Sequence, residues 1–449
     1  MTDVLPEAIA RVSHVRRYVH RAALGMVVVA ICVLAIQRPT GVAHAGLAGL
    51  YLALSVIGAT TISWMLYAWR EKDAPALTAF PPIQLPPELS FSLILPARHE
   101  QDVLFDTIAQ LRRQDHPAFE VVVVIGHDDR ETRIVAEQAI AGDPRFLIVT
   151  DVNEAKNKPK ALNTALGECT GDVVGVFDAE DFVATSLLRS VDQVFRETGT
   201  DVVQGATQLM NFHSSWFAVR NVLEYYFWFK SRLHFHARAG FIPLGGNTVF
   251  VRREWLRAIG GWDEDCLAED CELGGRLSAL GARTVVAYTS ELATREETPE
   301  TLSALIKQRT RWNQGYLQVL RKRDWTALPL GPRLLAAYTL AFPFLQAAMA
   351  VVLPIAIVTM LLLPVPIVLA LLSFVPAVTV LVVLGIELIG LYEFGLEFGV
   401  KPRVRDYARL AAGVIPYQLV LAFAATRAAW RELRGVRNWE KTAHVGAHL

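Results

Sequence analysis

The sequence is poor in charged residues and has no excess of either sign. Asp, Glu, Lys and Arg make up 20% of its 449 residues, whereas 53% are hydrophobic. This composition is more apolar than that of an ordinary soluble protein, so we expect part of the chain to lie in a lipid bilayer. Acidic and basic residues are equal in number, at 44 each, so the overall charge gives no support for nucleic acid as a partner.

Cysteine is scarce as well. The four cysteines have neither the spacing of a metal site nor that of a disulfide framework: Cys32, Cys169, Cys266 and Cys271. This usage suits a reducing compartment, and the simplest interpretation is four unrelated buried thiols.

Charge is absent from two runs near the N-terminus, residues 22–37 and 46–69. Each approaches the length of about 20 residues that a bilayer-spanning helix needs. Basic residues precede the first run and follow the second, so the positive-inside rule places both flanks in the cytoplasm. The alternative is a cleaved signal peptide, because "AHA" at 43–45 follows a short apolar stretch. Either interpretation leaves the following domain in the cytoplasm.

The middle of the chain alternates between short β-rich runs and helical segments. The runs are "FSLILPA", "EVVVVIG", "FLIVTD" and "DVVGVFDAED". Such alternation indicates an α/β fold with a mostly parallel sheet covered by helices on both faces. We therefore expect an N-terminal region with two transmembrane helices (1–89), a cytoplasmic α/β domain (90–325) and a C-terminal membrane region with a basic tail (326–449).

The C-terminal region is almost continuously apolar over residues 334–391, interrupted chiefly by prolines. This length predicts two long, kinked spans. A third candidate, 410–426, is shorter and contains Pro416 and Gln418. Three spans would put the tail outside, whereas the arginines of 427–437 indicate the inside. The third segment is therefore interfacial or re-entrant, or the tail is an exception to the rule. We expect no regulatory barrel domain after the last apolar run.

Three acidic residues, Asp178, Glu180 and Asp181, directly follow a predicted buried strand. In open α/β sheets, ligands bind at the carboxyl ends of the strands. Carboxylates there can hold Mg²⁺ or Mn²⁺, which commonly bridge protein carboxylates to substrate phosphates. The alternative interpretation is a solvated turn or a helix cap.

Two further segments fit a nucleotide site. In "NKPKALNTAL", Lys158 and Lys160 open a helix expected from about residue 161, where cations and free backbone N–H groups can face a diphosphate. Asp128 and Asp129 follow the "VVVVIGH" strand and can accept hydrogen bonds from a base or ribose. An ordinary acidic loop explains these two aspartates equally well.

A second acidic pair, Glu269 and Asp270, opens a helix in "CLAEDCELGG". The helix dipole alone favours acids in a first turn. A carboxylate beside a sugar-phosphate carbon can also act as general base towards an incoming hydroxyl group.

The segment "QRTRW" lies in a helix predicted over 302–320, where Gln308, Arg311 and Trp312 share one face and Arg309 points away from it. An arginine can clamp a leaving diphosphate, and a tryptophan ring can stack on a sugar. The alternative is a juxtamembrane helix with a snorkelling arginine and an interfacial tryptophan.

Taken in this order, from "LILPARHE" through "QRTRWNQG", these motifs resemble the membrane-integrated family 2 glycosyltransferases. That group includes bacterial cellulose synthase, hyaluronan and chitin synthases and cellulose-synthase-like mannan synthases. The resemblance implies a GT-A type, Rossmann-like catalytic domain on the cytoplasmic side of a multi-pass protein of the cell membrane. It also implies inverting, processive transfer of sugar from a nucleoside-diphosphate sugar to a growing β-linked polysaccharide.

The resemblance also assigns roles to residues. Asp178 matches the acidic metal-diphosphate motif, with Glu180 in place of the second Asp, so the second metal ligand is Glu180 or Asp181. Asp270 matches the catalytic base of a Thr-Glu-Asp motif in which Ala268 replaces Thr. The Gln-x-x-Arg-Trp signature of processive enzymes is complete and is expected to bind the nucleotide sugar and the acceptor: Gln308, Arg311 and Trp312.

The remaining matches concern the two substrates. The basic segment maps onto Lys160, Ala161 and Asn163, and Glu100 and Asp129 would contact the nucleoside. The acceptor side would comprise the loop residues Gly246 and Asn247 together with Glu269 and Trp312.

Two other functions remain open at this point. One is a non-processive transferase that adds a single sugar to a lipid or glycan acceptor. The other is a non-catalytic transport or scaffold subunit, against which the intact acids and the full "QRTRW" argue. An accessory secretion subunit is a further partner that the resemblance allows.

Overall fold

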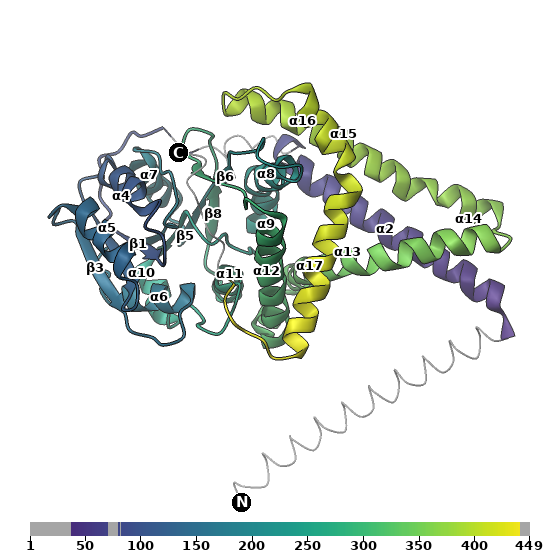
Figure 1. Ribbon diagram of the computed structural model, residues 1–449, viewed down its shortest axis with the longest axis horizontal. Coiled ribbons are helices and arrows are strands. Elements are labelled where there is room, and N and C mark those ends of the chain that lie inside the picture. The colour runs from purple at the N-terminus through teal and green to yellow at the C-terminus, as the bar shows by residue number, and fades with distance from the viewer. Residues whose placement is uncertain (1–36, 71–79, 81, 441–449) are drawn as a thin grey trace, which may run out of the picture. The chain divides into compact units, whose positions relative to one another are not determined.

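The computed structural model describes residues 37–70, 80 and 82–440 (Figure 1). These residues form two compact units. The smaller contains residues 37–60 and 351–381, and the larger contains the described residues of 61–350 together with 382–440. The first predicted span, 22–37, lies outside the described residues except for Gln37.

A seven-stranded sheet in the order β3-β2-β1-β4-β7-β5-β8 forms the centre of the larger unit. Its strands are β1 (Phe91–Ala97), β2 (Phe119–Gly126), β3 (Phe146–Asp151), β4 (Val173–Val176), β5 (Val202–Gly205), β7 (Val249–Arg252) and β8 (Thr284–Ala287). Strand β7 is antiparallel to both of its neighbours, and the other neighbouring pairs are parallel. A separate parallel pair joins β6 (Thr207–Leu209) to β9 (Thr294–Glu296). The predicted mostly parallel sheet is confirmed.

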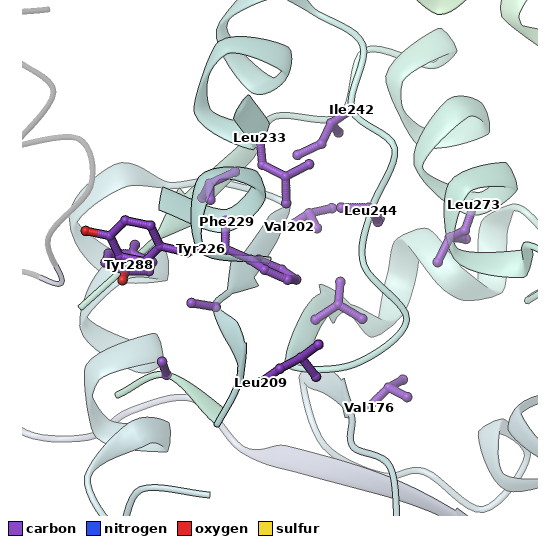
Figure 2. Packing of buried hydrophobic residues seen from close by; sticks show 14 of the residues in the cluster. Val176, Val202, Leu209, Tyr226, Phe229, Leu233, Ile242, Leu244, Leu273 and Tyr288 are labelled. Atoms are coloured by element: carbon purple, nitrogen blue, oxygen red, sulfur yellow. The ribbon is translucent and has the colours of Figure 1, made fainter. Parts of the chain in front are cut away.

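Both faces of the sheet are covered, which explains the nearly unbroken Val, Ile and Leu runs of its strands. Successive strand residues point to opposite faces, so Leu93 and Leu95 of β1 enter one hydrophobic core and Ile94 enters the other. Figure 2 shows part of the second core, where Val176 and Val202 of the sheet meet helical side chains.

Helices α4 (Leu104–Arg112), α5 (Arg130–Ile140) and α7 (Leu187–Thr198) supply the core on the first face. The second face is covered by α6 (Lys158–Leu166), α8 (Ala218–Phe227), the π-helix η1 (Trp228–Arg232), α9 (Leu233–Ala239), α10 (Arg253–Ala258) and α11 (Glu269–Ala279). Helix α12 (Leu302–Lys322) and the short 3-10 helix η2 (Asp324–Ala327) follow the sheet in the chain.

Three segments of the described chain are helices long and apolar enough to cross a membrane. They are α2 (Pro39–Arg70), α13 (Leu330–Leu362) and the pair α14 (Ile367–Leu372) and α15 (Phe374–Glu397). They coincide with the predicted second N-terminal run and the two predicted C-terminal spans. Within the smaller unit Tyr51 donates a hydrogen bond to Met360 Sδ at 2.8 Å, while large apolar side chains such as Leu361 are exposed. Exposed apolar surface of this kind suits contact with lipid.

The third C-terminal candidate is bent by 52° between α16 (Val404–Ala412) and α17 (Val414–Leu433). Helix α17 lies beside α12 in the larger unit (Figure 1). Gln314 of α12 donates to Glu432 at 3.1 Å and accepts from Arg431 Nε at 3.1 Å. Arg431 and Glu432, which follow the predicted third segment, therefore bind the neighbouring helix α12.

Candidate active site

The carboxyl ends of parallel strands β1 to β4 meet at one edge of the sheet and border a cavity of about 820 Å³. Its opposite wall comes from the first turn of α11 and from one side of α12. The cavity thus brings together Asp178, Asp270 and Trp312, which are far apart in the chain.

Most of the residues singled out from the sequence line this cavity: Glu100, Lys158, Ala161, Asp178, Glu180, Gly246, Asn247, Glu269, Asp270, Gln308, Arg311 and Trp312. Asp128, Asp129, Lys160, Asn163 and Asp181 lie outside its lining.

Lys158 lies between the two acidic clusters. Helix α6 begins at Lys158, earlier than expected from the sequence, because the Asn157 side chain caps it and Pro159 is favourable in a first turn. Two residues of a helix that are separated by one other point to nearly opposite sides, so Lys158 faces the cavity and Lys160 does not. Lys158 Nζ donates to Asp178 Oδ1 and, at 2.8 Å, to the Gly246 carbonyl oxygen. Burial lowers the pKa of Lys158, but the carboxylates of Asp178, Glu269 and Asp270 outweigh it and raise that pKa overall.

Asp181 stabilises the acidic turn through hydrogen bonds. Its carboxylate accepts hydrogen bonds from the Asp178 backbone N–H at 2.8 Å and from Asn247 Nδ2 at 2.9 and 3.1 Å. Burial, and then the charge of Glu296, raise its pKa well above the usual range. Asp181 therefore positions the turn, while Asp178 and Glu180 line the cavity.

The chemistry of this turn fits a divalent cation that is shared with a substrate. Mg²⁺ is typically held by one or two carboxylates plus substrate phosphates, and Asp178 and Glu180 can provide two. No group of three His, Cys, Asp or Glu side chains within the described ranges could hold a metal ion by itself. The oxygens of a bound diphosphate would have to complete the coordination.

Glu269 and Asp270 open α11, as expected, and both line the cavity, where Glu269 is buried and Asp270 is half-buried. Asp270 Oδ1 accepts a hydrogen bond from the Cys271 backbone N–H at 2.7 Å. Burial raises the pKa of Asp270, while Lys158 and Arg311 act to lower it. Burial and then the charge of Asp270 raise the pKa of Glu269 to about 7. Two adjacent acids therefore share one site in which a proton can be held near neutral pH.

Gly246 lets the backbone approach this pair. A Cβ at this position would lie 3.2 Å from Asp270 Oδ2 and 3.5 Å from Lys158 Nζ. A side chain at position 246 would therefore crowd Asp270 and Lys158, and glycine avoids this contact.

Helix α12 presents polar atoms that have capacity to bind a ligand. Gln308 Oε1 and Arg311 Nε are buried and have no hydrogen-bond partner among the described residues. The Arg311 guanidinium lies 4.3 Å from the ring centre of Trp439. Arg309, expected to point away from this face, also lines the cavity, because it pairs with Glu224 of α8. The prediction that Arg309 is turned away from the site is wrong.

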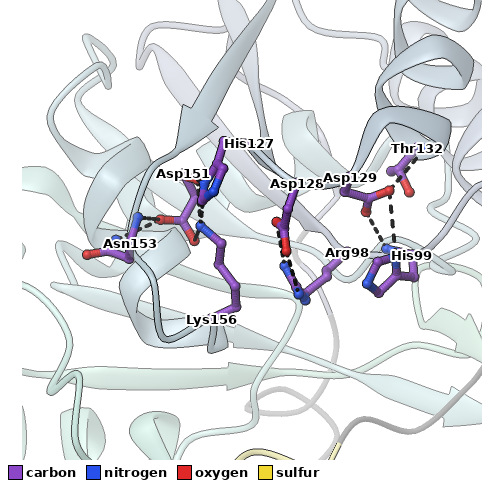
Figure 3. Close-up of polar contacts among 9 residues, drawn as sticks. All are labelled: Arg98, His99, His127, Asp128, Asp129, Thr132, Asp151, Asn153 and Lys156. Carbon is purple, nitrogen blue, oxygen red and sulfur yellow. Dashed lines mark hydrogen bonds and ion pairs between the residues drawn. The ribbon is translucent and has the colours of Figure 1, made fainter.

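Figure 3 shows the polar contacts at the ends of β1 to β3. Arg98 donates two hydrogen bonds to Asp128 at 3.0 Å each, which hold the pKa of Asp128 at about 2. Asp129 accepts from the His99 backbone N–H at 2.5 Å and from the Thr132 N–H at 3.3 Å, so it caps α5. Asp129 thereby orients the β1 loop, whose residues Arg98–Glu100 line the cavity.

Several cavity residues were missed from the sequence: Lys156, Glu224, Arg232, Tyr316 and Trp439. Tyr316 follows Trp312 by four residues, so helical periodicity alone would have placed it on the same side. The other four carry no local signal, since their positions depend on how distant segments pack.

Comparison with known proteins identifies related sequences. A family model described as "Glycosyltransferase like family 2" matches residues 86–315. A beta-monoglucosyldiacylglycerol synthase of Synechocystis sp. is 28% identical over 298 residues, covering 64% of this chain and 60% of that protein. A poly-beta-1,6-N-acetyl-D-glucosamine synthase of Staphylococcus epidermidis is 23% identical over 254 residues, covering 56% of this chain and 60% of that protein. The chain thus spans about three fifths of the length of these two curated relatives.

The fold has a counterpart among solved structures. A mannosyltransferase, PcManGT from Pyrobaculum calidifontis, in complex with GDP-Man and Mn²⁺, superposes with a TM-score of 0.52 at 20% identity. The match covers 85% of this chain and 99% of that structure. It confirms the expected GT-A fold.

Proposed function

Because the chain belongs to glycosyltransferase family 2, we propose that it is an inverting, membrane-bound transferase that moves a sugar from a nucleoside-diphosphate sugar to an acceptor hydroxyl group. The observation that carries this proposal is the single cavity bordered by both acidic clusters and by the Gln-Arg-Trp face of α12. The apolar helices α2, α13 and α14–α15 would hold the domain at the membrane, with the catalytic domain in the cytoplasm.

The donor would bind along the strand ends. Asp178 and Glu180 would hold Mg²⁺ or Mn²⁺, which when bound neutralises charge on the diphosphate. Gln308 and Arg311 offer unpaired polar atoms for the departing diphosphate. Glu100 would contact the nucleoside. Asp129 and Lys160 would act indirectly, through the β1 loop and the first turn of α6.

The acceptor would approach from the side of Asp270. Its hydroxyl oxygen forms a bond to the anomeric carbon while its proton passes to the Asp270 carboxylate. The bond from that carbon to the diphosphate breaks on the opposite face, which inverts the configuration and gives a β-linkage. Lys158 and Arg311 favour the ionised form of Asp270 against the cost of burial. Gly246, Asn247, Glu269 and Trp312 would border the acceptor.

Two kinds of acceptor satisfy this chemistry. A growing polysaccharide would make the enzyme processive, whereas a lipid or short glycan would receive one sugar. The relatives named above include a synthase of each kind by name. Product length on a gel distinguishes a polymer from a single transferred sugar.

The assignment of Asp270 can be tested in purified full-length protein. UDP- and GDP-sugars are screened with Mg²⁺ and Mn²⁺ for release of nucleoside diphosphate, and chelation of the metal should abolish that release. With the donor identified, Asp270→Asn should lower transfer by about 10²- to 10⁴-fold, the usual contribution of a general base. Donor affinity should remain near that of the wild type, because Asp270 serves the acceptor.

The matched control is Asp265→Asn, which removes an exposed carboxylate five residues earlier and outside the cavity. This variant should transfer at the wild-type rate. Full turnover by Asp270→Asn would remove Asp270 from the role of base, and release of no nucleoside diphosphate from any donor would contradict the proposed activity.

A further inference from the structure

Arg232, the last residue of η1, lies in the cavity wall inside an aromatic cage. Its guanidinium carbon is 3.9 Å from the ring centre of Trp64, 4.8 Å from that of Trp228 and 5.5 Å from that of Phe342. Its Nε donates a long hydrogen bond of 3.5 Å to His236 Nε2. In the part of the chain that the structure describes, Nη1 and Nη2 have no hydrogen-bond partner and no carboxylate pairs with the guanidinium.

Four other cations of the same cavity form ion pairs: Lys158 with Asp178, Arg309 with Glu224, Arg98 with Asp128 and Lys156 with Asp151. Arg311 forms no ion pair among the described residues, but its charge lowers the pKa of Glu269 and Asp270, and the charge of Glu224 likewise acts on Arg232, whose pKa it raises. A charge removed from water is costly unless it is paired, and aromatic faces compensate a cation only in part. Burial lowers the pKa of Arg232 to about 10, so the guanidinium stays charged at neutral pH. The guanidinium of Arg232 therefore has hydrogen-bond donors and a charge that an anionic ligand could satisfy.

The cage stands beside the apolar helices. Trp64 belongs to α2 and Phe342 to α13, two of the helices long enough to cross a membrane. Met65, Pro343 and Val383 extend the apolar wall of the same cavity. A ligand that binds here can bring an apolar chain with it.

Tyr316 links this end of the cavity to the catalytic carboxylates. Burial raises the pKa of its phenol, Asp270 raises it further, and Arg232 lowers it. Tyr316, Asp270 and Arg232 all line the same cavity. An acceptor held at Arg232 would therefore share one cavity with Asp270.

We propose that Arg232 binds the phosphate of an anionic phospholipid whose headgroup hydroxyl is the sugar acceptor. The planar guanidinium matches two phosphate oxygens at once, and the aromatic and apolar walls suit the start of an acyl chain. This inference rests on the proposed function and names its acceptor class. The hydroxyl oxygen bonds to the anomeric carbon and its proton goes to Asp270. The nucleoside diphosphate leaves with the electron pair of the broken bond, and the product is a phospholipid carrying one sugar.

Binding of dioctanoyl phosphatidylglycerol to the full-length protein tests the site without requiring turnover. Arg232→Gln should weaken binding by about tenfold or more, because it removes a charge-assisted hydrogen-bonded contact to phosphate. The affinity of Arg232→Lys should lie between those of the wild type and Arg232→Gln, because lysine keeps the positive charge but cannot donate the two parallel hydrogen bonds of a guanidinium. Arg238→Gln is the matched control: Arg238 lies on the next helix, is exposed, and is outside the cavity lining. Equal binding by wild type and Arg232→Gln would overturn the proposal, provided both bind nucleotide normally.

Transfer of labelled sugar separates an acceptor lipid from a lipid that merely binds. Vesicles of phosphatidylglycerol are compared with phosphatidylcholine vesicles containing diacylglycerol, a neutral acceptor. Label should enter phosphatidylglycerol, with its KM raised in Arg232→Gln and unchanged in Arg238→Gln. Label found only in diacylglycerol or in a polymer would overturn the proposal, even if phosphatidylglycerol binding depends on Arg232. Absence of nucleoside diphosphate release with every donor and acceptor would instead contradict the proposed function.

Discussion

Glu269 and Asp270 illustrate how a residue's charge is decided by groups that lie far away in the chain. Burial raises the pKa of both, and Lys158 and Arg311 act against it from α6 and α12. A carboxyl group whose pKa is higher in the folded state than in the unfolded state loses its proton more easily in the unfolded chain. It therefore lowers the free energy of unfolding at any pH high enough to ionise it in the unfolded chain. For Glu269 this destabilisation begins as the pH rises above about 4.5 and is complete above about 7.

Glu269→Gln should therefore be more stable than the wild type above pH 7, and the difference should vanish below pH 4.5. The amide has nearly the same shape and does not ionise, so only the titration is removed. Thermal unfolding of both proteins across this pH range measures the effect. A difference that is independent of pH would show that the carboxylate of Glu269 does not titrate in this window.

At the scale of elements, a glycine sets how closely α12 approaches α11. A Cβ on Gly315 would overlap the backbone nitrogen and Cβ of Ala268, the residue just before Glu269, and would lie 2.9 Å from its Cα. Gly315 belongs to the "QRTRWNQG" segment, which also supplies Gln308 and Arg311. Helix α12 can therefore place its polar side chains beside the carboxylates of α11 only because this position has no side chain.

Gly315→Ala should push the two helices apart, lower transfer by about tenfold or more, and destabilise the protein by about 1 to 3 kcal/mol, as overpacking usually does. Gly331→Ala is the control, since Gly331 is also helical and no atom lies within 4 Å of its added Cβ. Alanine has the higher helix propensity, so this control should be neutral or slightly stabilising. Sugar transfer and melting temperature are measured for both variants. Normal transfer by Gly315→Ala would mean that the close approach of Gly315 to Ala268 is not needed for the site.

Prediction from sequence was most reliable for elements with strong periodicity. Helix α12 was expected over 302–320 and extends over Leu302–Lys322, because its pattern is long; the structure shows that the Thr301 side chain caps its first turn. Helix α6 was expected from about residue 161 and begins three residues earlier, at Lys158. Proline is favourable in a first turn, where its missing N–H costs nothing.

At the scale of the larger unit, an ion pair between Arg220 and Glu387 joins the α/β domain to the C-terminal helices. Arg220 of α8 donates to both oxygens of Glu387 in α15, at 3.0 and 3.2 Å. It also donates to the Leu410 carbonyl oxygen of α16 at 2.6 Å. The Arg220 side chain is 4% exposed, so loss of its partner would leave a buried charge.

Glu387→Gln should lower the stability of the protein by about 3 to 5 kcal/mol, the range found when one member of a buried pair is removed. Glu300→Gln, at an exposed position, is the control and should change little. Thermal unfolding in detergent or nanodiscs gives the comparison. A melting temperature unchanged by Glu387→Gln would indicate that Arg220 needs no carboxylate there.

The sequence by itself determined the apolar helices, the mostly parallel sheet, and which acidic and basic motifs follow which strands. These features arise from periodicity and composition within short segments, so they can be read locally. Only the tertiary structure decided that Lys158 lies between the acidic clusters, that Asp181 turns inward to Asn247, and that Arg232 stands in an aromatic cage. Each of these depends on contacts between segments distant along the chain, and no local pattern encodes which distant side chain will supply the charge, the hydrogen bond or the ring.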